Sequence, residues 1–347
     1  MVNDKQILTG LFKKELAELL NAYPSFRSVQ IYEWILKGVF SFDEMKNIPL
    51  SLRKELSEKF SPGSCEVISV LDDSDGTVKL GIKLKDGSVI EGVILADGKG
   101  RKTACISTQA GCPAGCLFCR TGSIGFGRNL TASEITEQFL RLRSMEKDIT
   151  HIVIMGMGEP LLNLSELRRS LDFIMNKDGI NISKRRITLS TCGIADGIID
   201  LAENGPDIRL ALSLTTAREE LRALLMPVSR NNPLHAIKKA LLEYQKKRKQ
   251  RLTLEMVLLS GINTTKNDIK AARDFSRGLD AVINLIPWNP VPGLEFNGSP
   301  FKKPDEKEVA GFADELKSAG LNITIRLEKG QGISGACGQL GLSRLQD

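Results

Sequence analysis

The fold is decided by the stretch Cys105-Ile106-Ser107-Thr108-Gln109-Ala110-Gly111-Cys112-Pro113-Ala114-Gly115-Cys116-Leu117-Phe118-Cys119. Four of the seven cysteines lie in this stretch, and the last three have the spacing C-x3-C-x2-C. Short, unequal spacers in a glycine-containing loop allow Cys112, Cys116 and Cys119 to converge on one metal centre. Iron–sulfur clusters are bound by cysteine thiolates, usually four of them. Three ligands from one loop therefore predict a cluster with one iron left open, and an open metal position is typical of catalytic sites.

Other interpretations of the cysteines remain open from the spacing alone. Cys105 could supply a fourth ligand, which would close a structural zinc or cluster site. A disulfide framework is disfavoured because the chain is long, the cysteine count is odd, and Met1–Lys5 has no export signature. We expect Cys65 and Cys192 to be small buried residues.

The composition is that of a globular protein with a sizeable core. The chain has 347 residues, 41% of them hydrophobic and 26% charged, which fits one large catalytic domain and a smaller one. No apolar run reaches the length of a membrane helix, so we expect a cytoplasmic protein without membrane contact. The net charge of +6 includes the cluster Lys184-Arg185-Arg186 and residues 246–249. Such runs suit a phosphate-rich partner, and they suit a solvated helix face equally well.

Histidine chemistry has little support in this chain. The only two histidines, His151 and His235, begin a predicted strand and a predicted helix, so we expect structural roles for both. No phosphate-binding loop of the Gly-Lys-Ser/Thr type is present.

The order of patterns along the chain predicts three regions. Residues 1–62 have apolar residues at helical spacing and predict a small helical accessory domain. Residues 63–97 alternate as strands do, with Asp75-Gly76 and Asp86-Gly87 as turns, and predict a short β-hairpin extension. Residues 98–347 predict the catalytic domain and its carboxyl-terminal tail.

Strands and helices alternate through the catalytic region. Thr131-Ala132-Ser133-Glu134 has the capping-box pattern that begins a helix. The expected strands are Thr103–Ser107, Ile152–Met155, Ile187–Leu189, Leu210–Leu212, Leu254–Leu258 and Ile283–Ile286. Six βα units imply parallel strands with right-handed crossovers, so the predicted fold class is α/β, a partial six-stranded parallel barrel. Active sites of such folds lie at the carboxyl ends of the strands.

Several motifs in order give this chain a family resemblance. They are Ser107–Cys112, Gly156-Met157-Gly158-Glu159-Pro160-Leu161-Leu162-Asn163, Pro287-Trp288-Asn289-Pro290 and Ala336-Cys337-Gly338-Gln339-Leu340. With the C-x3-C-x2-C loop, they resemble the dual-cysteine radical SAM RNA adenine methyltransferases of the RlmN and Cfr types. The match runs from about Glu91 to Leu340, and more weakly through residues 1–62. Pro160 and the segment 286–293 are more similar to the RlmN type.

The resemblance implies the cofactors and their ligands. One [4Fe-4S] cluster would be bound by Cys112, Cys116 and Cys119, and two S-adenosylmethionine (SAM) molecules would be used per turnover. The implied SAM-binding residues are Gly158, Glu159, Ser190, Ser213, Leu214, Thr215 and Asn289. Relatives commonly carry histidine where this chain has Thr215.

The resemblance also implies a mechanism with two cysteines. Carbon-2 of adenine cannot attack a sulfonium methyl as an amine does, so Cys337 would first accept the methyl group. A 5′-deoxyadenosyl radical would then take hydrogen from that methyl, and the carbon radical would add to the base. Glu91 would act as proton acceptor. Cys105 would release the product by attacking Cys337, which leaves a disulfide bond for reduction.

The implied activity is methylation of carbon-2 of an adenosine in 23S rRNA, with a tRNA adenosine next to the anticodon as a further substrate. The expected partners are RNA and an electron donor such as flavodoxin or ferredoxin, and the expected state is a monomer. One alternative is the carbon-8 methyltransferase of the Cfr type. Another, of a different class, is a non-catalytic metal-stapled RNA-binding protein in which Cys105 closes the metal site.

Overall fold

The computed structural model describes residues 5–98, 100–326 and 328–341, and these are built around one ten-stranded sheet. The order of its strands is β16-β13-β12-β11-β10-β9-β6-β5-β4-β3. The parallel strands are β6 (Lys102–Cys105), β9 (Ile149–Ile154), β10 (Ile187–Thr191), β11 (Arg209–Ser213), β12 (Leu252–Leu258), β13 (Ala281–Pro287) and β16 (Ile323–Ile325). The six predicted strands are confirmed, and the short β16 extends the parallel sheet beyond them.

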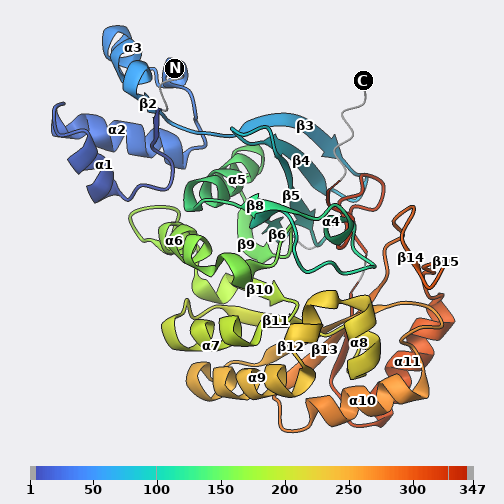
Figure 1. Ribbon diagram of the computed structural model, residues 1–347. Helices are drawn as coiled ribbons and strands as arrows, with labels where there is room; N and C mark the ends of the chain where they lie inside the picture. The colour runs from blue at the N-terminus through green and yellow to red at the C-terminus, as the bar shows by residue number, and fades with distance from the viewer. Residues whose placement is uncertain (1–4, 99, 327, 342–347) are drawn as a thin grey trace.

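Helices cover the outer face of the curved sheet, as Figure 1 shows. They are α5 (Ala132–Met145), α6 (Leu164–Met175), α7 (Ala195–Asn204), α9 (Leu234–Arg248), α10 (Lys266–Ser276) and α11 (Glu306–Ser318). The strand residues that face them are aliphatic and fully buried, such as Ile152, Leu210 and Leu254. The predicted capping box of α5 is confirmed, because Thr131 N–H donates to Glu134 at 2.9 Å and Glu134 N–H donates to Thr131 at 3.3 Å.

The predicted hairpin region forms three antiparallel strands. These are β3 (Glu66–Asp72), β4 (Val78–Lys83) and β5 (Val89–Ala96), and β5 pairs with β6. The turns at Gly76 and Gly87 have φ values of +81° and +87°, which glycine adopts without strain. The extension therefore continues the central sheet beyond its parallel part.

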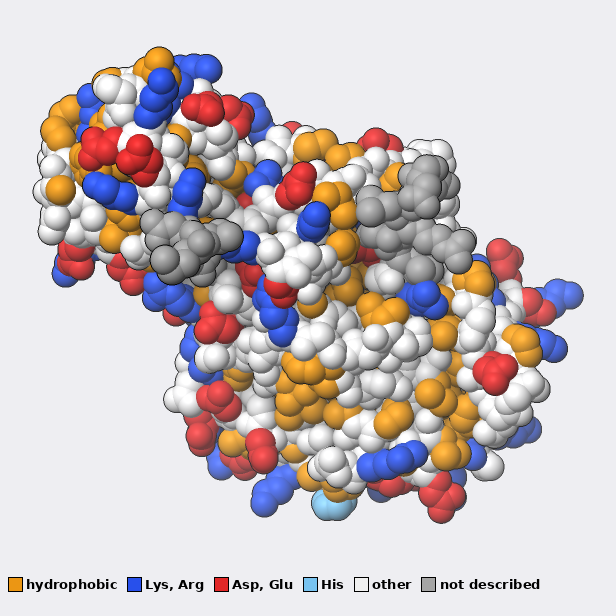
Figure 2. Space-filling model, turned by 45° about the horizontal axis from the view of Figure 1, so that its top comes forward, with side chains coloured by type: hydrophobic (Ala, Val, Ile, Leu, Met, Phe, Trp, Pro, Cys, Tyr) orange, Lys and Arg blue, Asp and Glu red, His pale blue; other side chains and the backbone are white. Residues whose placement is uncertain are grey.

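The amino-terminal region is a small helical module, visible as a separate lobe in Figures 1 and 2. It contains α1 (Lys13–Leu19), α2 (Ser25–Leu36), η1 (Phe42–Glu44), α3 (Leu50–Lys59) and the parallel pair β1 (Gln6–Ile7) and β2 (Phe60–Ser61). Its buried side chains include Leu16, Ile31, Ile35 and Leu56. The domain boundaries at residues 62 and 97 remain a prediction.

Charge is mixed on the face shown in Figure 2, where Lys and Arg side chains alternate with Asp and Glu. The described part of the chain contains no helix that is both long and apolar enough to cross a membrane.

Candidate active site

The cysteine loop is held by a small antiparallel ladder. Strand β7 (Gln109–Gly111) pairs with β8 (Phe126–Asn129), and Cys112 N–H donates to the Gly125 carbonyl at 2.8 Å. Gly111 has φ of +78°, and a Cβ atom there would lie 2.0 Å from the Gly125 oxygen. Only glycine fits this position, which explains the glycine directly before the first predicted iron ligand.

The three predicted iron ligands line one cavity. Burial raises the pKa of the Cys112 thiol to about 12, and it raises the pKa values of Cys116 and Cys119 as well. A metal deprotonates the thiols that it binds, so metal binding would lower these raised pKa values. The loop is fixed from outside, since Trp288 Nε1 donates to the Phe118 carbonyl at 2.9 Å.

The interpretation that Cys105 closes a zinc site is not supported. Cys105 borders a different cavity from the one lined by the three cysteines. In the described ranges, no three His, Cys, Asp or Glu side chains converge on a position for one metal ion. A four-iron cluster is larger than one ion and spreads its thiolates further apart.

Arg222 provides a test of whether the site fits an anionic cluster. It is fully buried on α8 (Glu219–Leu225), and its guanidinium donates to the carbonyls of Cys192 at 2.6 Å and Leu214 at 3.2 Å. Its Nη1 has no hydrogen-bond partner among the described residues, and its charge lowers the pKa of Cys116, which burial raises. A buried cation with a spare donor beside the thiols fits a cluster bound by three thiolates. Sequence reasoning missed Arg222, although a charge within the apolar run Leu221–Leu225 was a usable sign.

The predicted SAM-binding residues gather in the cavity that contains the cysteines. The cavity has a volume of about 150 Å³. Its lining includes Gly158, Glu159, Ser190, Ser213, Thr215 and Asn289. Leu214 is the exception, because its side chain is fully buried in the core and does not line the cavity.

Glu159 is a buried carboxylate with capacity left for a ligand. Its Oε1 accepts hydrogen bonds from Leu161 N–H at 3.0 Å and from the Thr191 hydroxyl at 2.7 Å. Its Oε2 accepts one from Cys192 N–H at 2.7 Å. Burial raises the pKa of Glu159, and these donors oppose the rise. A carboxylate has about four acceptor positions, so the side chain can still accept from an ammonium or a hydroxyl group.

A chain of hydrogen bonds crosses the carboxyl ends of three strands. The Ser190 hydroxyl lies 3.0 Å from that of Ser213 and donates to Glu255 at 2.7 Å. Glu255 is on β12, is buried, and lines the same cavity. It was not predicted from sequence, because a single carboxylate in an alternating strand has no distinguishing pattern.

Thr215 has two features that point to a ligand. Its φ is +58°, which is a genuine outlier for a β-branched residue and is most frequent at functional sites. Its buried hydroxyl has no partner among the described residues, and the residue lines the cavity. Thr215 therefore offers a free hydroxyl to this cavity.

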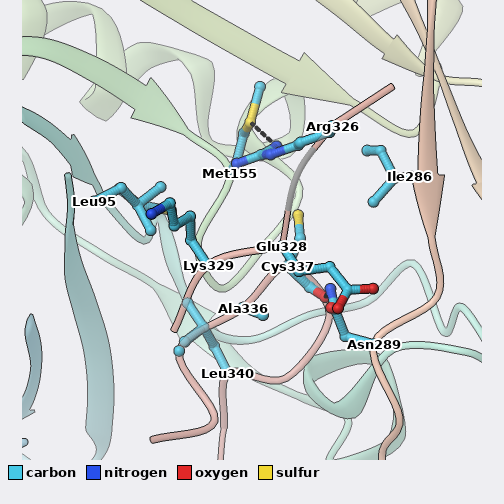
Figure 3. A pocket seen from close by; sticks show the side chains of 12 residues that line it. Leu95, Met155, Ile286, Asn289, Arg326, Glu328, Lys329, Ala336, Cys337 and Leu340 are labelled. Carbon is cyan, nitrogen blue, oxygen red and sulfur yellow. Dashed lines mark hydrogen bonds between the residues drawn. The ribbon is translucent and has the colours of Figure 1, made fainter. Parts of the chain in front are cut away.

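Cys105 and Cys337 lie on a second cavity, shown in Figure 3, and Cys337 also borders the first. Both are free thiols. Burial, and to a smaller extent the nearby Cys337, raises the pKa of Cys105 to about 12. Burial also raises the pKa of Cys337, and Arg326 opposes that rise. In Figure 3 the Cys337 side chain points toward the side of the cavity where Arg326 and Met155 lie.

Arg326 is a second residue that sequence reasoning missed. Burial would lower its pKa, but the neighbouring Cys337, Glu255 and Cys105 raise it overall. It follows the short strand β16, so its position depended on a strand that was not predicted.

The tail that carries Cys337 is docked. Gly330 N–H and Gly332 N–H each donate at 2.9 Å, to Asp75 and Asp73 respectively in the β3–β4 turn. Closer to the thiol, Asn289 Nδ2 donates to the Cys337 carbonyl at 2.9 Å. Cys337 is therefore held in place beside both cavities.

Glu91 lies behind the tail and borders neither cavity. Its side chain is 2% exposed, more deeply buried than expected, and it pairs with Lys79, which is 4% exposed, at 3.1 Å. Gly341 N–H donates to the same carboxylate at 2.6 Å. Glu91 therefore contacts the tail directly, four residues beyond Cys337.

Comparison with known proteins supports the arrangement. Residues 106–275 match the Radical SAM superfamily, and residues 8–61 match the ribosomal RNA large subunit methyltransferase N-terminal domain. A probable dual-specificity RNA methyltransferase RlmN of Treponema denticola is 50% identical over 337 residues, which cover 97% of this chain and 96% of the relative. The chain belongs to the RlmN family of radical SAM RNA methyltransferases. A Thermus thermophilus relative of the same name is 40% identical over 91% of this chain and 89% of its own length.

A solved structure agrees with this family assignment. The crystal structure of a radical SAM methyltransferase from Sphaerobacter thermophilus superposes with a TM-score of 0.90 and 34% identity, covering 96% of this chain and 99% of that one. RlmN-family membership identifies an enzyme that uses SAM and an iron–sulfur cluster, and it confirms the resemblance stated from the motifs.

Proposed function

We propose that this enzyme methylates carbon-2 of an adenosine in 23S rRNA, and that a tRNA adenosine next to the anticodon is a second substrate. The relatives are named dual-specificity RNA methyltransferases, which supports two RNA substrates. The segment 286–293 and Pro160, similar to the RlmN type, favour carbon-2 over carbon-8.

One observation carries the proposal: Cys337 borders both the cavity of the iron ligands and the cavity of Cys105. A thiol in that position can receive a methyl group on one side and be attacked by a second thiol on the other. A non-catalytic RNA-binding protein would have no use for this pair of cavities.

The roles of the protein side chains follow from their places. Cys112, Cys116 and Cys119 would hold one [4Fe-4S] cluster, with Arg222 as a buried donor beside it. Glu159, Ser190, Ser213, Thr215 and Asn289 would orient SAM, with Gly158 giving its backbone and Leu214 only supporting the wall. When bound, the cluster and two SAM molecules per turnover supply the electron, the methyl group and the hydrogen-abstracting radical.

The remaining steps belong to Cys337 and Cys105 of the second cavity and to Glu91 behind the tail. Cys337 would carry the methyl group to the adenine, and the positive charge of Arg326 would favour its thiolate form. Glu91 would accept the proton that leaves the base, once the tail at Gly341 moves away from its carboxylate. Cys105 would then attack Cys337 and free the product, and a reductant would restore both thiols. Flavodoxin or ferredoxin would supply electrons to a monomeric enzyme.

The test is anaerobic turnover with 23S rRNA transcript, SAM and a reductant, followed by mass spectrometry of nucleosides. We expect 2-methyladenosine and 5′-deoxyadenosine from the wild type. Cys337→Ala should give no methylated base, and Cys105→Ala should accumulate RNA linked to the protein. Formation of 8-methyladenosine, or of no methylated base by the wild type, would overturn the proposal.

A further inference from the structure

The inner face of the curved sheet is a polar groove instead of a packed core. Each of six neighbouring strands turns a polar side chain inward: Thr103, His151, Thr188, Arg209, Thr253 and Asn284. All six are half-buried or exposed. Closed barrels fill this space with branched aliphatic side chains. Here it is a cavity of about 450 Å³, which we call the barrel groove.

The outer end of the barrel groove is basic. Arg101 precedes β6, Arg186 precedes β10, and Arg209 begins β11, and all three are exposed. Burial lowers the pKa of His151 in their midst. The three guanidiniums lower it further, and Asp97 opposes them.

Most of this positive charge is not neutralised by the protein. Asp97 pairs with Arg101 at 3.3 Å. Arg186 and Arg209 form no ion pair within the described part of the chain. A second cavity shares Thr188, Arg209 and Thr253 with the groove, and its Lys184 and Arg251 are paired with Asp207 and Asp280.

The other end of the barrel groove opens on the reactive thiols. The groove and the cavity of Cys105 and Cys337 share Leu95, Met155, Arg326 and Lys329. Arg209 and Ser213 mark the two ends of β11, roughly 13 Å apart at the rise of a strand. That length accommodates a few nucleotides of an extended strand.

We infer that the barrel groove is the path of the RNA backbone, and that Arg186 and Arg209 bind phosphates at its outer end, on one side of the adenosine presented to Cys337. The inference rests on the proposed function and adds where the substrate strand lies. The guanidinium is planar and suits bidentate phosphate contacts. RNA bases that react must leave their stack, and phosphate contacts beside the target hold the strand in place while the base is out.

An acidic electron-donor protein is the competing occupant of a basic surface. The groove shares four lining residues with the cavity of Cys105 and Cys337, and only Met155 and Glu255 with the cavity lined by Cys112, Cys116 and Cys119. A donor protein needs a short distance to the cluster, so this geometry favours the nucleic acid.

The test compares reconstituted holoenzyme with Arg186→Glu/Arg209→Glu. The matched control is Arg273→Glu/Arg277→Glu, which makes the same change in net charge on the outer helix α10, at side chains 48% and 77% exposed. Fluorescence anisotropy measures the Kd of a short labelled oligoadenylate and of a 23S rRNA transcript between about 50 and 300 mM KCl. Iron content and circular dichroism verify that each variant is folded.

We expect the groove variant to bind both RNAs on the order of tenfold more weakly. For oligoadenylate, the slope of log K against log salt concentration should be smaller in magnitude by about 1.4, the value for two phosphate contacts. The control should match the wild type. The inference would be overturned if the groove variant had the Kd and the salt dependence of the wild type, or if the control bound RNA equally weakly. It would also be overturned if the groove variant were reduced more slowly by flavodoxin while its RNA affinity was unchanged. The binding assay needs no methyl transfer, so failure of the proposed function would be seen separately, as a wild type that binds RNA and does not methylate it.

Discussion

Replacing Gly111 by alanine tests whether the loop backbone positions the first iron ligand. A left-handed alanine costs about 1–2 kcal/mol. The new Cβ would lie 2.0 Å from the Gly125 oxygen, and contacts under 3.0 Å are essentially never observed, so that oxygen must retreat. Its retreat breaks the 2.8 Å hydrogen bond from Cys112 N–H. A buried N–H without a partner costs about 1–3 kcal/mol more.

We therefore expect Gly111→Ala to lose about 2–5 kcal/mol of the free energy of unfolding and to bind less iron, because Cys112 is displaced. Gly125→Ala is the matched control, since φ is +80° and nothing lies within 4 Å of the added Cβ. It should lose only about 1–2 kcal/mol and keep its iron. Urea denaturation of the cluster-free proteins and iron and sulfide per chain after anaerobic reconstitution measure both effects. Equal stability and equal iron content in the two variants would refute the reasoning.

Three further predictions concern the buried groups around the site. Glu91→Gln should lower the free energy of unfolding by about 3–5 kcal/mol, because the buried Lys79 loses its charged partner. Adding Lys79→Met should restore most of that free energy. Urea denaturation measures both effects, and a double variant no more stable than Glu91→Gln would contradict the prediction. Burial raises the pKa of Cys105 to about 12, above its unfolded value of about 8.5, so stability falls as the pH rises above the latter. Between about pH 9 and pH 10, the free energy of unfolding of Cys105→Ala should therefore fall by about 1 kcal/mol less than that of the wild type. The same pH dependence of unfolding in both proteins would count against this prediction. Trp288→Phe removes the donor to the Phe118 carbonyl and should cost about 1–3 kcal/mol in thermal unfolding, whereas an unchanged Tm would show that the contact is unimportant.

The sequence was informative where a residue's role depends on its neighbours in the chain. Alternation of aliphatic residues predicted strands such as β11, and the spacing of Cys112, Cys116 and Cys119 predicted a shared cavity. The glycine at 111 is explained by a close approach that only the folded ladder creates.

The residues that were missed depend on partners far away in sequence. Arg326 faces Cys105 and Glu255 because β16 brings it to the sheet edge, and three residues of strand are too short to give a pattern. Glu91 was assigned a role by resemblance, but its pairing with Lys79 on the adjacent strand required the register of β4 and β5. Periodicity predicts which face of a strand or helix a side chain lies on. It does not predict which charged side chains from other elements that side chain contacts.

The tail is fastened to the segment that follows the last iron ligand. Arg120 N–H donates to the Gly338 carbonyl at 2.8 Å, and the Thr121 hydroxyl donates to the Leu340 carbonyl at 2.6 Å. Both anchors directly follow Cys119, so the tail and the segment after the last predicted iron ligand are coupled in position. A shift of residues 120 and 121 would therefore also shift the backbone on the carboxyl-terminal side of Cys337.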